Sequence, residues 1–420
     1  MSMSFIVPSD AKSWVDVPAD NHFPIQNLPF GVGCPDNHPE CVCVRIGDHV
    51  LHLWTLMDAG LIPEEEFPTL CSFQDMDRAH MTEIRRIAYE LLREDNPTLR
   101  DNAELRSHAL QPIDKADIQL PVLIGAFVDF YSGINHASNV GKMFRPDMPP
   151  LLPNYRELPV GYNGRACSIL VSGEPVRRPK GQTKAPDAER PVYGPTKELD
   201  FELEMGFFTG RGNTLGEPIP IDQFGDYVLG FVLVNDWSAR DVQRWEYQPL
   251  GPFLAKSFGT SISPWVVTLD ALEPFRVAGP KQDPPPLDHL RTDQKWHFNI
   301  ELEVAIQTEK MTKPQVVTRT NAQELYWSFA QQLAHQASNG TNVEPGDLYA
   351  SGTISGTDPG SFGSLLELTW RGQNAITMEE TGEKRTFLED GDTVIMSGWC
   401  QGDGYRVGFG TVEGKILPSL

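Results

Sequence analysis

LDFELEM, residues 199–205, is the stretch that decides the fold class of this sequence, because its apolar and acidic side chains alternate. A period of two is typical of a β-strand, which we expect to span residues 199–208. The next apolar run, YVLGFVLVN at residues 227–235, has the length of a buried strand and is far too short to cross a bilayer. Further short segments bounded by Gly, Pro or Asp follow at residues 298–306, 364–370 and 392–396. The chain beyond about residue 120 therefore predicts a large mixed sheet with few helices.

The first 120 residues differ in character and predict a separate domain. Two short alternating segments at residues 42–46 and 50–53 indicate the strands of a small β-unit. A helical stretch follows at about residues 76–94, with an apolar stripe on one side, and Asn96-Pro97 ends it. We therefore expect an N-terminal domain at residues 1–120 and a C-terminal domain at residues 121–420.

The C-terminal part interrupts its strands with two proline-rich stretches and one helix. The stretches at residues 174–197 and 279–288 have the length of lids or surface loops. The helix is expected after Asn321, which forms a capping-box pattern with Glu324, and it should end before Gly340.

The composition excludes several classes of function. The chain of 420 residues carries 35 basic and 57 acidic side chains, a net charge of −22 that would repel the phosphates of nucleic acids. No basic segment followed by an apolar stretch marks the N-terminus, and no run is long enough for a membrane span. The six cysteines of such a chain indicate reduced thiols and a cytoplasmic protein. An anionic substrate would need a locally basic pocket or a bound cation.

Several familiar site motifs are missing from the sequence. It has no nucleophile elbow, no Walker A loop and no dinucleotide-binding glycine pattern. Cys34, His38, Cys41 and Cys43 suggest a zinc cluster, but their spacing fits no common zinc finger, and core or surface thiols are the simpler interpretation.

The acidic side chains give a stronger signal. Alternation places Glu202 and Glu204 on one face of their strand, where adjacent carboxylates repel unless a cation or water separates them. Oxygen ligands alone would favour Mg²⁺ or Ca²⁺. The competing interpretation is a half-buried strand with a solvated face. Glu301 and Glu303 show the same pattern, and periodicity does not distinguish the two pairs.

Asp236 follows a buried apolar run directly, where a charge needs a partner. The ends of strands are also where mixed sheets hold ligands. Asp236 opens a polar cluster that continues with Trp237, Ser238, Arg240, Asp241, Gln243, Tyr247, Lys256 and Thr260. The alternative for Asp236 is a buried ion pair with Arg240.

A third group lies in one loop-like stretch that contains Asp129, Tyr131, His136 and Arg145. A single histidine is usually a satisfied polar residue, so His136 gains interest only from these neighbours. Glu367, in the alternating segment 364–370, could orient its imidazole. The alternative for Glu367 is a glutamate that faces solvent.

At these residues the sequence resembles the fumarylacetoacetase family nearly from end to end, from FPIQNLP at residues 23–29 to QGDGYR at residues 401–406. The most specific blocks are DFYSGINHASNVGKMFR (129–145), LDFELEM (199–205), NDWSARDVQRWEYQPLGPFLAKSFGTSISPWV (235–266) and ASGTISGTDPGSFGSLLEL (350–368). Agreement over blocks of this length does not arise by chance.

The resemblance implies a mostly β fold, with a small SH3-like β-barrel as N-terminal domain, a C-terminal mixed β-sandwich roll and a homodimeric assembly. It also implies a metal-dependent hydrolase. Such an enzyme cleaves a carbon–carbon bond of 4-fumarylacetoacetate, a small β-diketo acid, and releases fumarate and acetoacetate. This is the last step of tyrosine and phenylalanine catabolism.

The resemblance also assigns a role to each candidate residue. It implies an Mg²⁺ or Ca²⁺ site, a base with its orienting carboxylate, groups that stabilise an oxyanion, and groups that contact substrate. The metal site falls on Asp129, Glu202, Glu204 and Asp236, with Lys256 and Thr260 beside it; the base is His136, oriented by Glu367; the oxyanion groups are Arg240, Gln243 and Lys256; and the substrate contacts are Tyr131, Arg145, Gln243, Tyr247 and Thr353.

The same comparison of residues distinguishes three positions from the site. The Glu301 and Glu303 pair matches no family site and should not contact a metal. Asn163 stands where the family often has histidine, which leaves the detail of the pocket open.

Two other functions compete with this interpretation. A shorter relative that decarboxylates or hydrolyses an acylpyruvate would lack the N-terminal domain, and residues 1–120 argue against it. A scaffold that keeps the fold without catalysis would have no use for His136, Glu367, Arg240 and Lys256 together.

Overall fold

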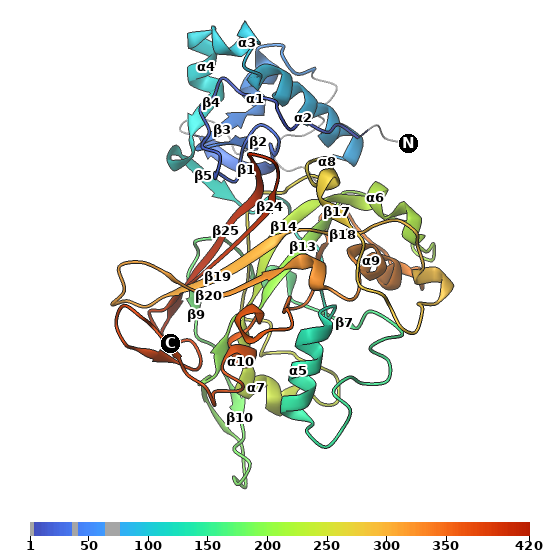
Figure 1. Cartoon of the computed structure of the whole chain (residues 1–420), viewed down its shortest axis with the longest axis vertical. Helices are drawn as coiled ribbons and strands as arrows, with labels where there is room; N and C mark the ends of the chain where they lie inside the picture. Colours follow the sequence, from blue (N-terminus) through green and yellow to red (C-terminus); the bar gives the residue numbers. More distant parts are fainter. Residues whose placement is uncertain (1–3, 36–40, 64–75) are drawn as a thin grey trace.

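The computed structural model describes residues 4–35, 41–63 and 76–420. A smaller N-terminal unit lies at one end of the molecule, and the larger β-rich remainder extends away from it (Figure 1). The fold is mostly β with some helix, as the sequence predicted. Within the described residues no helix is both long enough and apolar enough to cross a membrane.

The N-terminal unit is a five-stranded antiparallel sheet with helices packed on it. The strands lie in the order β4-β3-β2-β1-β5. The elements are β1 (Phe30–Pro35), β2 (Cys41–Ile46), β3 (His49–His52), α1 (Leu53–Asp58), α2 (Arg78–Leu92), α3 (Pro97–Arg100), α4 (Ala103–Ala109), β4 (Leu110–Pro112), η3 (Ile113–Lys115) and β5 (Ala116–Gln119). The predicted strands at 42–46 and 50–53 and the predicted helix at 76–94 are thus confirmed within a few residues.

The N-terminal unit and the rest of the chain share one hydrophobic core. Leu28, Val44 and Ile84 belong to the same buried cluster as Leu229 and Val266. The backbones are joined as well, because the Phe30 amide donates to the Val266 carbonyl at 3.0 Å. The two parts therefore support each other.

The centre of the larger part is a seven-stranded mixed sheet in the order β7-β6-β21-β13-β14-β16-β8. Its strands are β6 (Phe127–Phe130), β7 (Gly161–Asn163), β8 (Ile169–Val171), β13 (Leu203–Thr209), β14 (Val228–Asp236), β16 (Thr260–Ile262) and β21 (Leu348–Ala350). Every residue of β13 and β14 is buried, on both faces of each strand. The solvated face that alternation allowed for residues 199–208 is therefore wrong, because both sides of this strand are covered.

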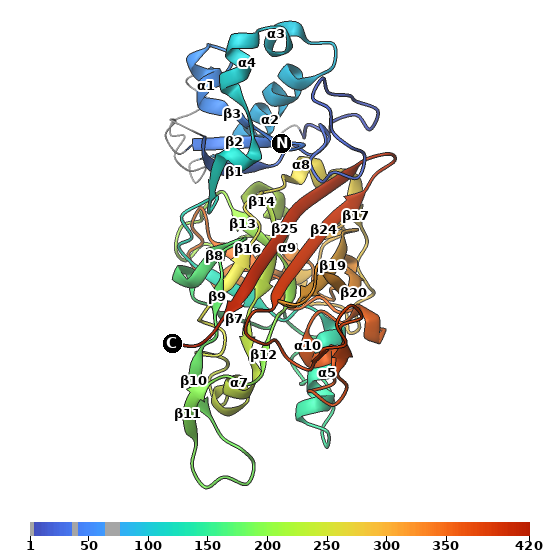
Figure 2. The same ribbon diagram turned by 90° about the vertical axis from the view of Figure 1, so that its left-hand side faces the viewer.

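A second sheet packs against the first. It has the order β20-β19-β24-β25-β9, with strands β9 (Val176–Arg177), β19 (Glu301–Gln307), β20 (Gln315–Asn321), β24 (Thr393–Gln401) and β25 (Arg406–Leu417). Strand β14 contacts β24 and β25 across the interface, so the two sheets form a sandwich (Figure 2). Aromatic rings fill the core, with the ring centroids of Phe207 and Tyr349 at 5.1 Å and those of Phe231 and Phe298 at 5.2 Å.

Two local predictions are wrong, and a third needs more detail. Residues 364–370 do not form a strand, because Ser364 caps the short helix α10 (Leu365–Leu368) by accepting from the Glu367 amide. The helix expected after Asn321 is only the single turn η8 (Ala322–Glu324), and α9 (Phe329–Ala337) begins later, at the capping box of Ser328 and Gln331. The stretch at 174–197 is a surface excursion rather than a plain loop, because it carries β9 and the hairpin of β10 (Lys180–Thr183) and β11 (Val192–Pro195), which projects from the body (Figure 2).

The remaining elements are short. They are α5 (Ile134–Phe144), η4 (Ala166–Ser168), β10 (Lys180–Thr183), β11 (Val192–Pro195), β12 (Leu199–Asp200), η5 (Ile221–Gln223), α6 (Phe224–Tyr227), β15 (Ser238–Ala239), α7 (Arg240–Glu246), α8 (Leu269–Leu272), η6 (Glu273–Phe275), β17 (Arg276–Val277), η7 (Asp288–Leu290), β18 (His297–Phe298), η9 (Pro359–Ser361), β22 (Ile376–Thr377) and β23 (Lys384–Arg385).

Candidate active site

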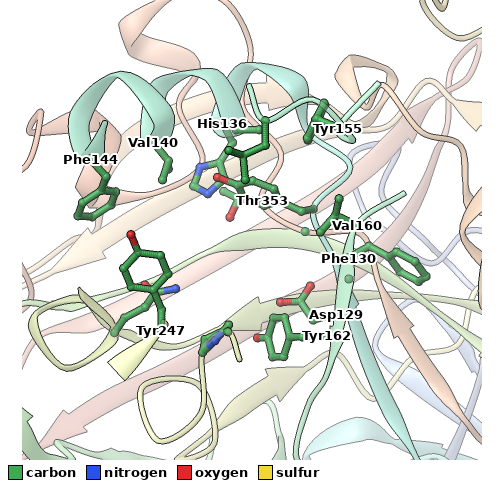
Figure 3. Close-up of a pocket in the computed structure, with 18 of the residues that line it drawn as sticks. Asp129, Phe130, His136, Val140, Phe144, Tyr155, Val160, Tyr162, Tyr247 and Thr353 are labelled. Carbon is green, nitrogen blue, oxygen red and sulfur yellow. The ribbon is translucent and has the colours of Figure 1, made fainter. Parts of the chain in front are cut away.

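A cavity of about 550 Å³ lies where the central sheet meets helices α5 and α7. His136 points into it from α5, while Asp129 and Tyr162 lie together on the side of the sheet (Figure 3). All but four of the predicted site residues line this cavity. The lining ones are Asp129, Tyr131, His136, Arg145, Glu202, Arg240, Gln243, Tyr247, Lys256 and Thr353. The other four, Glu204, Asp236, Thr260 and Glu367, are buried and do not line it.

Four carboxylates converge at the floor of the cavity. One oxygen of each of Asp129, Glu202, Glu204 and Asp236 lies within 4.8 Å of the others, and all four side chains are buried. The sheet brings them together, because β6, β13 and β14 carry Asp129, Glu204 and Asp236, and Glu202 directly precedes β13. Among the described residues this is the one group of side chains with such a spacing.

The carboxylates fit a divalent cation on electrostatic grounds. Burial and the neighbouring carboxylates raise the pKa of Asp129 and of Glu204 well above the ordinary value. Oδ1 of Asp129 and Oε1 of Glu204 are also buried without a hydrogen-bond partner. A cation between these oxygens would offset the repulsion between the carboxylates and give the two unpartnered oxygens a ligand to bind. A donor set of oxygens alone suits Mg²⁺ or Ca²⁺.

Lys256 and Thr260 hold the acidic group from the other side. Nζ of Lys256 donates to Glu202 and, at 2.7 Å, to Oδ2 of Asp236. Oγ1 of Thr260 donates to Oδ1 of Asp236 at 2.8 Å. Burial alone would lower the pKa of Lys256, but Asp236 and Glu202 raise it above its usual range, so the ammonium stays charged.

His136 lies in the first turn of α5, and Nδ1 of its ring is 2.6 Å from Oε2 of Glu367. Its other nitrogen, Nε2, is 3.8 Å from Oε1 of Glu202. We expected the stretch 129–145 to be a loop, and this is wrong. It consists of the end of strand β6 followed by helix α5. A helix fixes the position of the imidazole far more firmly than a loop would.

Glu367 is buried, so the alternative that it faces solvent is wrong. Besides His136, it accepts from Asn139 Nδ2 at 3.0 Å, from Ser355 Oγ at 2.9 Å and from Ser364 Oγ at 2.8 Å. Burial would raise the pKa of Glu367, but the hydrogen bonds from His136, Asn139 and Ser364 and the charge of His136 outweigh burial and lower the pKa. The carboxylate is thus ionised and can stabilise positive charge on the imidazole.

Arg240 begins helix α7 and reaches the acidic group. Its Nη1 lies 2.8 Å from Oε1 of Glu202 and donates to Oε1 of Gln243 at 3.2 Å. Its Nε donates to Asp200 at 2.8 Å, so Arg240 is not the partner of Asp236, whose buried ion pair is with Lys256. Nη2 of Arg240 is buried and has no partner, which leaves one strong donor available beside the cavity.

The structure also separates residues that sequence patterns could not distinguish. Glu303 forms an ion pair with Arg319 at 2.9 Å, and neither it nor Glu301 belongs to the carboxylate group. Asn163 is exposed at the end of β7 and does not line the cavity. Cys41 and Cys43 are buried in β2, while His38 lies outside the described residues.

Sequence reasoning missed Tyr162, Asn139, Ser355 and Ser364. The Tyr162 hydroxyl donates to Oδ2 of Asp236 at 2.9 Å, and its ring lines the cavity (Figure 3). One signal was present, because Ser364 and Glu367 have the spacing of a capping box, which predicts the start of a helix.

Comparisons with known proteins agree with these observations. The family model described as "Fumarylacetoacetate (FAA) hydrolase C-terminal" matches residues 126–417, and the one described as "Fumarylacetoacetase N-terminal" matches residues 26–121. The chain is 51% identical to the fumarylacetoacetase of Rattus norvegicus, over 97% of this chain and 99% of that protein. It is 48% identical to the fumarylacetoacetase of Arabidopsis thaliana over the same shares.

A solved structure shows the same fold at lower identity. A Mycobacterium smegmatis protein described as HpcE superposes with a TM-score of 0.53 at 20% identity, covering 92% of this chain and 99% of that one. This likeness concerns the fold alone.

Proposed function

The chain belongs to the fumarylacetoacetase family, and from this premise we propose that it hydrolyses 4-fumarylacetoacetate to fumarate and acetoacetate, the last step of tyrosine and phenylalanine catabolism. One observation carries the proposal: a buried histidine–carboxylate pair faces four converging carboxylates in a single cavity. A base beside a cation site is what hydrolysis of a β-diketone needs.

In the proposed reaction His136 removes a proton from a water molecule in the cavity. The water oxygen bonds to the carbonyl carbon next to the fumaryl double bond, and the carbon–carbon bond to the acetoacetyl methylene then breaks. The electron pair of that bond stays on the methylene carbon, which takes up a proton and becomes the methyl group of acetoacetate. Glu367, at 2.6 Å from Nδ1, stabilises the protonated imidazole during these steps.

We assign Arg240, Gln243 and Lys256 to the developing oxyanion. The unpartnered Nη2 of Arg240 supports this role, because it is a buried donor without a competing acceptor. Tyr131, Arg145, Gln243, Tyr247 and Thr353 would contact the substrate, and all five line the cavity. Arg145 offers a cation for a substrate carboxylate.

Asp129, Glu202, Glu204 and Asp236 would hold Mg²⁺ or Ca²⁺, with Lys256 and Thr260 beside it. When bound, such an ion supplies Lewis-acid polarisation of the diketone oxygens.

Three further features follow from membership of the family. We propose an SH3-like barrel for residues 1–120, a catalytic domain at 121–420, and assembly as a homodimer. We also propose a cytoplasmic location, supported by the free cysteines 43, 167 and 400.

An absorbance assay for the loss of fumarylacetoacetate tests the proposal. We expect equal amounts of fumarate and acetoacetate, loss of activity with a chelator, and recovery on adding back Mg²⁺ or Ca²⁺. A chelator already saturated with Ca²⁺ is the control. No consumption of fumarylacetoacetate by the metal-loaded protein would contradict the proposed function.

A further inference from the structure

Asp200 is a completely buried carboxylate that lies outside the group of four. It ends strand β12 and accepts four hydrogen bonds. Oδ2 accepts from Nε of Arg240 at 2.8 Å and from the Leu366 amide at 3.0 Å. Oδ1 accepts from the Leu365 amide at 2.7 Å and from the Phe201 amide at 2.8 Å.

These donors belong to two separate parts of the site. Arg240 is a proposed oxyanion group, whereas the amides of Leu365 and Leu366 open helix α10, which carries Glu367 two residues later. Helix α10 contacts α5, the helix that carries His136. Asp200 therefore links Arg240 to the helix that carries Glu367, the partner of His136.

Helix α10 depends on such an anchor. It has four residues, and a helix of this length has no stability of its own. Ser364 satisfies only the Glu367 amide at its start, so the amides of Leu365 and Leu366 rely on Asp200. If these bonds were lost, α10 and the Glu367 carboxylate on it would be free to shift.

We propose that Asp200 is a positioning residue: it fixes Arg240 relative to the Glu367–His136 pair and thereby sets the geometry of the reaction. This inference rests on the proposed function. The position of Asp200 requires a carboxylate, because all four of its hydrogen-bond partners are donors. An asparagine would direct its own N–H groups at one pair of donors, which would leave them without an acceptor.

Asp200→Asn tests the proposal. We expect kcat to fall by about 10–100-fold, the usual loss when a supporting contact of a site is removed. KM should change much less, because Asp200 does not line the cavity. Hydrogen exchange should accelerate locally in the peptide covering residues 363–368.

Asp392→Asn is the matched control. Asp392 is equally buried and accepts from Nε and Nη2 of Arg385 at 2.8 and 2.9 Å and from the Glu389 amide, but it does not line the cavity. This variant should lose thermal stability while keeping kcat and the exchange rate of residues 363–368.

A double variant separates positioning from general damage. In a Glu367→Gln background, Asp200→Asn should lower kcat by a smaller factor than it does in the parent protein, because part of its effect is transmitted through Glu367. Asp200→Glu, which keeps the charge but displaces the carboxylate, should fold and still lose kcat. A kcat within a few-fold of the parent in either single variant, fully multiplicative losses, or failure of both to fold would overturn the proposal.

The hydrogen-exchange readout does not depend on turnover. If the parent protein left fumarylacetoacetate intact, the proposed function would fail, and the local release of residues 363–368 in Asp200→Asn would still test the anchor.

Discussion

His136→Ala removes an imidazole that contacts Glu367 at 2.6 Å and points its other nitrogen into the cavity. If His136 is the base, kcat should fall by roughly 10²–10⁴-fold, which is about 3–5 kcal/mol of lost transition-state stabilisation. The proposed cation ligands are all carboxylates, so metal affinity should remain close to that of the parent. Glu367 loses one of four donors inside the protein, and stability should fall by about 1–3 kcal/mol.

The assay is the rate of fumarylacetoacetate loss at saturating substrate and metal, with metal affinity measured by calorimetry on the same samples. His108→Ala, on the exposed end of α4, is the control for replacing a histidine. Turnover of His136→Ala within a few-fold of the parent would refute the reasoning, because the water would then be activated without this imidazole. A large loss of metal affinity would refute the assignment of the ligands to carboxylates alone.

Three other predictions concern the metal ligands, the assembly and a buried histidine outside the site. Glu204→Gln should weaken Mg²⁺ and Ca²⁺ binding by at least about 10–100-fold in calorimetry, whereas Glu303→Gln, which alters a pair with Arg319, should not. Light scattering at micromolar concentration should give twice the mass of one chain; a monomer mass would contradict the homodimer. Burial lowers the pKa of His297 to about 4, so the unfolded state binds the extra proton between about pH 6.5 and 4. The free energy of unfolding should therefore fall as the pH drops through that window, and it should fall less steeply in His297→Gln; identical slopes in urea titrations would rule this out.

The sequence predicted the strands of the site better than their surroundings. Alternation at residues 199–205 predicted one strand, but the structure has β12 at 199–200 and β13 from Leu203, with Glu202 in an isolated bridge between them. Glu202 and Glu204 still lie together in the carboxylate group. Alternation also placed Glu301 and Glu303 on one side of a strand. A period of two shows which residues share a side of a strand, but not whether that side is buried. On β13 that side is closed by the Gly352 segment, whose amide donates to Glu204 at 2.9 Å, whereas Glu301 on β19 is exposed. Such cover comes from residues far away in the sequence.

The helix that carries Glu367 was missed for a different reason. Residues 364–370 are mostly apolar and short, and apolar runs of this length do not distinguish a buried strand from one helical turn. The spacing of Ser364 and Glu367 was the better signal, since the serine accepts from the Glu367 amide. The start of the later helix was misplaced because two capping patterns, at Asn321 and at Ser328, lie seven residues apart. The sequence favoured the first, and the helix begins after the second.

The electrostatics of the cavity explain how a chain with a net charge of −22 can bind an acidic substrate. Four buried carboxylates at the floor face two buried cations, Lys256 and Arg240, which leaves the group short of positive charge. The pKa values of Asp129 and Glu204 are raised because these buried carboxylates lie beside one another without enough positive charge nearby. A divalent cation would balance the four carboxylates, and the unpartnered Nη2 of Arg240 and the guanidinium of Arg145 would then face the substrate without excess negative charge beside them. Metal binding should therefore precede tight substrate binding, because without it the incoming anion meets uncompensated negative charge. An equilibrium measurement of substrate or product affinity that is unchanged by chelation would contradict this order.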